Sequence, residues 1–260
     1  MESSHLGMEH QSATAYGNHY VNGYFIGGNS GADLSGSGWG MKFDYIIVHE
    51  SGHEWFANNI TTNDIADMWV HEGFTDYSEP LFVECLYGKQ AADAYCQGLR
   101  RNIQNDQPVI GPYGVNKEGS GDMYAKGANM LHTIRQVIND DEKFRQILRG
   151  LNKDFYHKTV DSKDVEKYMT EKSGKDLSKI FDQYLRTTKI PVLEYKIEND
   201  NLSYRWTNCV DRFNMPLEIG AGGRSIWISP TPGWQKMKLQ PDYPINDYNK
   251  NFYITVKKVG

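Results

Sequence analysis

The sequence predicts an α+β protein with two parts, a mainly helical part over residues 1–188 and a small β-sandwich over residues 189–260. Two observations support this prediction. Apolar residues recur at helical spacing in several segments between Met41 and Leu185. After Ile190-Pro191 the pattern changes to short alternating runs separated by turn residues, which is typical of a small all-β unit.

The first 40 residues are rich in glycine and indicate extended segments joined by turns. Beyond them we expect helices over about 41–58, 65–86, 123–138, 141–151, 161–172 and 176–185. Gly88 and Gly98 bound a further stretch, and residues 111–121 form a loop with four glycines. In the second part, strands are expected over 193–197, 202–206, 215–219, 225–228, 237–239 and 252–256.

Composition excludes several classes of function. The chain has 28 Lys and Arg against 33 Asp and Glu, so its net charge of −5 argues against binding to nucleic acid. A mean hydropathy of −0.65 and the lack of a long apolar run argue against a membrane span, so we expect a soluble, folded chain. No secretion signal is visible.

Three cysteines (Cys85, Cys96, Cys209) give no disulfide framework, although pairing of Cys85 with Cys96 stays open.

The segment His49-Glu50-Ser51-Gly52-His53 carries the most specific chemistry. On a helix, residues four apart share one face, so the two imidazoles can bind a single ion. Glu50 points beside that ion, where a carboxylate can take a proton from water. Eighteen residues separate His53 from Glu72, and a carboxylate on a second, antiparallel helix would supply a third ligand. Two histidines and one glutamate leave a position open for water, as in catalytic zinc sites.

Alternatives remain for parts of this pattern. A bare H-E-x-x-H arises by chance in helices, but with Glu72 in place we predict one bound Zn²⁺ per chain. Asp76 lies four residues after Glu72 and shares its helix face. It is a candidate to accept a hydrogen bond from a ligand histidine. The alternative is an aspartate that faces solvent or caps a helix.

The stretch from Val48 to Glu79 resembles the aminopeptidase N and leukotriene hydrolase family of gluzincin metallopeptidases. That family has H-E-x-x-H, eighteen residues, then a glutamate within Trp-x-x-Glu-Gly-Phe. Residues 6–10 (Leu-Gly-Met-Glu-His) resemble its G-x-M-E-N motif, and residues 124–128 (Tyr-Ala-Lys-Gly-Ala) resemble its Tyr-x-Lys-Gly motif. The resemblance implies a thermolysin-like catalytic domain followed by a β-sandwich.

By this resemblance, the metal ligands are His49, His53 and Glu72, and Glu50 is the general base that activates a zinc-bound water. Tyr124 would donate its hydroxyl to the oxyanion of the tetrahedral intermediate. Glu9 would bind the free α-ammonium of the substrate, and the backbone around Gly7 and Met8 would pair with the extended peptide. Leu6 and His10 depart from the motif, which has glycine and asparagine at these two positions.

The resemblance also implies that sequence is missing. Family members have a β-rich domain before the catalytic domain, and their Met-Glu motif lies well inside that domain, whereas here it begins at residue 8. We therefore expect the first strands of the catalytic sheet to be absent, leaving an exposed edge that favours self-association. Many bacterial relatives are periplasmic or secreted, and the sequence is compatible with that location for a full-length parent.

The sequence thus predicts a zinc aminopeptidase that acts on peptides with a free N-terminus. Two alternatives stay open: an endopeptidase or epoxide hydrolase of the same family, and a zinc-binding fragment that is catalytically impaired.

Overall fold

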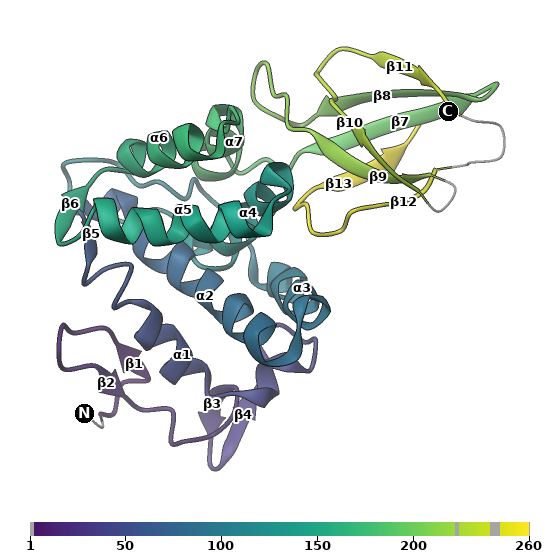
Figure 1. Cartoon of the computed structure of the whole chain (residues 1–260). Coiled ribbons are helices and arrows are strands. Elements are labelled where there is room, and N and C mark those ends of the chain that lie inside the picture. Colours follow the sequence, from purple (N-terminus) through teal and green to yellow (C-terminus); the bar gives the residue numbers. More distant parts are fainter. Residues whose placement is uncertain (1–2, 222–223, 240–244, 260) are drawn as a thin grey trace.

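The computed structural model describes residues 3–221, 224–239 and 245–259, and within them the chain is an α+β protein (Figure 1). Its α-helices are α1 (Tyr45–Gly52), α2 (Trp69–Tyr87), α3 (Lys89–Gly98), α4 (Ala125–Ile138), α5 (Asp141–Asp154), α6 (Ser162–Ser173) and α7 (Ser178–Arg186). Four short 3-10 helices in the described ranges are η1 (Trp39–Lys42), η2 (Ile65–Asp67), η3 (Leu99–Asn102) and η4 (Gly121–Met123).

Short strands pair within the helical part. They are β1 (Gly7–Met8) with β2 (Ala15–Tyr16), β3 (Tyr24–Gly27) with β4 (Ser30–Ala32), and β5 (Ile60–Thr62) with β6 (Lys158–Val160). The β5–β6 pair is parallel and was not expected from the sequence. It joins two segments about 100 residues apart, and three-residue strands give too short an alternation to be detected in a sequence.

The helix expected over 41–58 is shorter than predicted. Phe43 is extended, Asp44 is the N-cap whose carboxylate accepts the backbone N–H of Ile47 at 3.3 Å, and α1 ends at Gly52. The same carboxylate accepts the hydroxyl of Tyr16 at 2.5 Å and the amide of Asn18 at 2.8 Å. The N-terminal loops are therefore fixed to the start of the helix that carries the H-E-x-x-H motif.

Glycines let three helices approach closely around this motif. A Cβ at Gly52 would lie 2.6 Å from Oγ of Ser78, so α1 packs tightly against α2. A Cβ at Gly127 would lie 2.8 Å from Cα of Gly73, so α2 and α4 touch backbone to backbone. Since α4 begins at Ala125, the second contact places Tyr124 at the edge of the same region.

The C-terminal part contains two sheets within the described residues. One has the order β11-β8-β7-β13 and the other the order β10-β9-β12. Their strands are β7 (Val192–Glu198), β8 (Asn201–Thr207), β9 (Leu217–Ala221), β10 (Arg224–Ile228), β11 (Gln235–Lys238), β12 (Ile245–Tyr248) and β13 (Thr255–Lys258). Strand β12 was not expected, and the strand predicted over 252–256 begins only at Thr255.

The helical and β-rich parts share one hydrophobic core. Phe252 is fully buried, and buried side chains of both parts form one continuous cluster. The hydroxyl of Tyr184 in α7 donates to the carbonyl of Tyr253 at 2.6 Å, and the N–H of Tyr253 donates to Oγ1 of Thr133 in α4 at 3.0 Å. The predicted boundary at residue 188 falls between α7 and β7, and the division into two domains stays a prediction.

The three cysteines are free thiols. Among the described residues, no helix combines the length and apolar character that crossing a membrane requires.

Candidate active site

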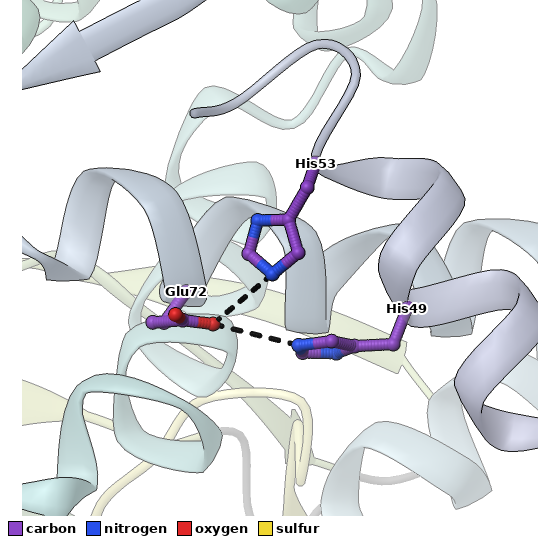
Figure 2. A group of neighbouring side chains, drawn as sticks. All are labelled: His49, His53 and Glu72. Carbon is purple, nitrogen blue, oxygen red and sulfur yellow. Dashed lines mark ion pairs between the residues drawn. The ribbon is translucent and has the colours of Figure 1, made fainter. Parts of the chain in front are cut away.

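The structure brings together the three side chains predicted to bind a metal (Figure 2). His49 comes from α1, His53 directly follows it, and Glu72 comes from the first turn of α2. Oε2 of Glu72 lies 3.4 Å from Nε2 of His49 and 3.3 Å from Nε2 of His53. All three residues are buried.

The opposite nitrogen of each imidazole has its own acceptor. Nδ1 of His49 lies 3.0 Å from Oε1 of Glu79, and Nδ1 of His53 lies 3.0 Å from the carbonyl oxygen of Phe56. Because a carboxylate and a carbonyl can only accept, each Nδ1 donates its proton. In the neutral imidazoles, both Nε2 lone pairs are then directed towards Glu72, which is the arrangement a metal ion requires.

The donor set fits a zinc ion. Oε2 of Glu72 is buried and has no hydrogen-bond partner in the described part of the chain, although two imidazole nitrogens face it. Burial alone would raise the pKa of Glu72, but the two imidazoles that face its carboxylate lower this pKa to about 2. Two imidazole nitrogens and a charged carboxylate within 4.8 Å of one another match the ligand types of catalytic zinc sites.

Two further carboxylates border the three predicted ligands. The ligand atoms of Glu9, Glu50 and His53 lie within 4.8 Å of one another. Oε2 of Glu50 is buried, again without a hydrogen-bond partner among the described residues. Burial raises the pKa of Glu50, and the negative charges of Glu9 and Glu72 raise it further. A carboxyl group with a raised pKa in such a position is suited to accept and return a proton.

Strand β1 passes directly over Glu50. A Cβ at Gly7 would collide with Oε1 of Glu50 and would lie 2.9 Å from Cγ2 of Ile46 in α1. The next residue, Met8, is 45% exposed and pairs with Ala15 of β2. The missing side chain at position 7 thus leaves room for the carboxylate of Glu50.

Tyr124 reaches the site from the junction of η4 and α4. Its ring stacks on that of His49, with centroids 6.0 Å apart and planes inclined by 29°. Burial raises the pKa of Tyr124 well above its ordinary value, so its hydroxyl stays protonated at neutral pH and can donate a hydrogen bond.

The hydrogen bond expected at Asp76 is made by another residue. Asp76 is buried, so it does not face solvent, but the acceptor beside His49 is Glu79. The other oxygen of Glu79 accepts the hydroxyl of Tyr95 at 2.6 Å. Burial raises the pKa of Asp76 well above its ordinary value, and the negative charge of Glu79 raises it further. Asp76 therefore lies beside Glu79, with ligand atoms of both residues and of His49 within 4.8 Å of one another.

Known proteins resemble this chain in sequence and in fold. This chain is 26% identical to the aminopeptidase N of Lactococcus lactis over 170 residues. That alignment covers 60% of this chain and 20% of the relative. This chain is also 24% identical to the aminopeptidase M1 of Arabidopsis thaliana over 197 residues, and that alignment covers 71% of this chain and 21% of the relative. The chain therefore spans about a fifth of the length of these relatives.

A solved structure resembles this chain in its fold. The structure of Legionella pneumophila aminopeptidase A in complex with aspartic acid matches with a TM-score of 0.68 at 17% identity. The match covers 98% of this chain and 30% of that one. The profile of the peptidase family M1 domain matches residues 40–184, which is more than half of the sequence and includes every predicted metal ligand. The resemblance inferred from the motifs is thereby confirmed, and the chain belongs to peptidase family M1.

Proposed function

We propose that this chain carries the active site of a zinc-dependent aminopeptidase, which releases the N-terminal residue of peptides. The observation that carries the proposal is the position of Glu9, whose carboxylate lies within 4.8 Å of both Glu50 and the proposed ligand His53. A carboxylate so close to the general base and the metal ligands can bind an α-ammonium group while the adjacent peptide bond lies at the metal.

The zinc ion would be held by His49, His53 and Glu72. Bound there, it supplies Lewis-acid chemistry, which polarises the scissile carbonyl and makes water a stronger acid. The protein's contribution is to keep the two Nε2 lone pairs and Oε2 of Glu72 directed at one point. Glu79 and the carbonyl of Phe56 maintain this orientation through the two Nδ1 protons.

Glu50 would move the proton. It takes a proton from the attacking water as the new C–O bond forms, and it passes that proton to the leaving nitrogen as the C–N bond breaks. Burial raises its pKa, which makes it a stronger base than an exposed carboxylate. The hydroxyl of Tyr124, which stays protonated, donates to the oxygen on which negative charge develops.

The proposal is tested with paired aminoacyl p-nitroanilides, one with a free amine and one N-acetylated, on zinc-loaded protein. We expect turnover of the free-amine substrate alone, and its loss in Glu50→Gln. Turnover of both substrates would indicate an endopeptidase. Turnover of neither substrate, with one zinc bound per chain, would indicate an impaired fragment.

Self-association through an exposed sheet edge stays a prediction, and light scattering tests it.

A further inference from the structure

The turn that follows α1 holds the ligand His53 from two sides. The carbonyl of Phe56 accepts the Nδ1 proton of His53 at 3.0 Å. The backbone N–H of Asn58 donates to the carbonyl oxygen of His53, also at 3.0 Å. Residues 56–58 thus fix both the imidazole and the backbone of this proposed ligand, and we call them the ligand turn.

The side chain of Asn58 extends from the ligand turn to the N-terminal strand. Its Nδ2 donates to the carbonyl oxygen of Glu9 at 3.1 Å and to Oε1 of Glu54 at 3.2 Å. Glu9 lies 49 residues earlier in the chain, just after the last residue of β1. One residue therefore hydrogen-bonds to the backbone of a proposed metal ligand and to the backbone of the proposed amine-binding residue.

The conformation of the ligand turn is strained and firmly held. Ala57 has φ 145°, a region that residues with a side chain rarely adopt. Its carbonyl accepts the hydroxyl of Thr61 at 2.5 Å, and the ring of Phe56 stacks on that of Phe74 in α2, with centroids 4.4 Å apart. Such strain persists only where surrounding contacts determine the backbone, and it occurs preferentially at functional sites.

Strand β1 alone gives Glu9 little support. Its ladder with β2 contains only two residue pairs, Gly7 with Tyr16 and Met8 with Ala15. Glu9 lies beyond both pairs, so its position relative to α1 depends on contacts outside the ladder. Since one residue of an extended peptide spans about 3.3 Å, a small shift of Glu9 would misplace the bond presented to the metal.

We propose that Asn58 is a positioning residue that sets the distance between the metal site and the amine-binding carboxylate of Glu9. It thereby determines how well the site recognises a free amine next to the scissile bond. This inference rests on the proposed function.

The test uses two hydroxamates, leucine hydroxamate and its des-amino analogue, which bind zinc alike but differ in the α-amine. Calorimetry on the zinc-loaded protein gives the ratio of their affinities without any turnover. In Asn58→Ala we expect this ratio to fall about fivefold, the effect of one hydrogen bond, with unchanged affinity for the des-amino compound. Asn58→Asp keeps the shape but loses the donor, so its ratio should fall at least as far.

Asn59→Ala is the matched control. The side chain of Asn59 bonds to Asn152 and to the backbone of His157, away from Glu9, so its loss should leave the ratio unchanged. An equal fall in Asn59→Ala, or no fall in Asn58→Ala, would overturn the proposal.

Hydrogen exchange separates this inference from the proposed function. Amides within residues 6–12 should exchange faster in Asn58→Ala than in wild type, and at the wild-type rate in Asn59→Ala. If the wild-type protein does not prefer the amine-bearing hydroxamate, amine recognition by Glu9 fails. The exchange rates then decide whether Asn58 holds the strand, and unchanged rates would refute it.

Discussion

Nδ1 of His49 lies 3.0 Å from Oε1 of Glu79, a residue 30 positions further along the chain and fully buried in α2. The hydroxyl of Tyr95 in α3 donates to the other oxygen of the same carboxylate. Three helices thus cooperate in orienting one imidazole. The proton on Nδ1 is held on the side away from Glu72, which leaves Nε2 free to bind a metal ion.

Glu79→Gln is therefore expected to lower zinc affinity by roughly 10- to 100-fold, the usual effect of removing a hydrogen-bonded partner of a ligand histidine. Competition with a chromogenic chelator measures this affinity. Asp76→Asn is the comparison, because Asp76 is buried beside Glu79 without being the acceptor of His49. A larger loss in Asp76→Asn than in Glu79→Gln would contradict our assignment.

Tyr124→Phe should lower kcat by roughly 100- to 1,000-fold with little change in KM, because its hydroxyl acts on charge that develops only in the transition state. Steady-state kinetics on the free-amine p-nitroanilide give both constants, and zinc content serves as the control. The role assigned to Tyr124 would be refuted by a rise in KM at constant kcat.

Gly7→Ala should lower kcat by roughly 10- to 100-fold, because the added methyl group collides with Glu50 and displaces the proposed general base. Gly233→Ala is a suitable control, since the nearest atom to its added Cβ is Oγ1 of Thr231 at 3.9 Å. Zinc content should stay at the wild-type value in both variants. Wild-type kcat in Gly7→Ala would show that Glu50 acts from a position other than the one described.

Lys126 provides a prediction about pH. The residue is fully buried, its Nζ donates to the carbonyl of Thr187 at 2.9 Å, and burial lowers the pKa of Lys126 from 10.5 to about 8. Between those two values the folded chain binds fewer protons than the unfolded chain, so the free energy of unfolding rises with pH.

Relative to Lys126→Met, the free energy of unfolding of the wild-type protein should therefore rise as the pH rises from about 8 to about 10.5. This relative free energy should be lowest below pH 8. Urea denaturation at pH 7.5 and at pH 10 measures the difference between the two proteins. If the difference in free energy of unfolding were the same at both pH values, Lys126 would titrate at its ordinary pKa.

The positions of the three proposed ligands were predictable because they depend on local geometry. His49 and His53 are one helical turn apart, and Glu72 lies in the first turn of α2, the helix that packs on α1. Asp76, four residues after Glu72, was one candidate to accept a hydrogen bond from a ligand histidine. The acceptor beside His49 is instead Glu79, seven residues after Glu72. At about 100° per residue, Glu79 lies roughly 20° from the direction of Glu72 and Asp76 roughly 40°. The signal was therefore present, and a closer count of helical angles favours Glu79.

Other features had no local signal. The contact between Asn58 and Glu9 joins residues 49 apart, and the β5–β6 pair joins strands of three residues. The strained backbone of Ala57 is held by the hydroxyl of Thr61 and by the packing of its neighbour Phe56 on Phe74 of α2, and the residue types involved predict no positive φ at this position. The helices expected in the first part were predicted to within a few residues, except at 41–58, where capping by Asp44 determines the start of α1. Helix α3 was not assigned in advance, because only its bounding glycines were recognised.

The burial of Phe252 and the contacts of Tyr253 with α4 and α7 have a consequence for cooperativity. Because these side chains belong to the same core as the helices, separating the two parts exposes apolar surface on each of them at once. The β-rich part should then melt together with the helices that carry the proposed metal ligands in a single calorimetric transition, rather than as an independent unit. A protein shortened after α7 would lose this buried surface and become a target for proteolysis.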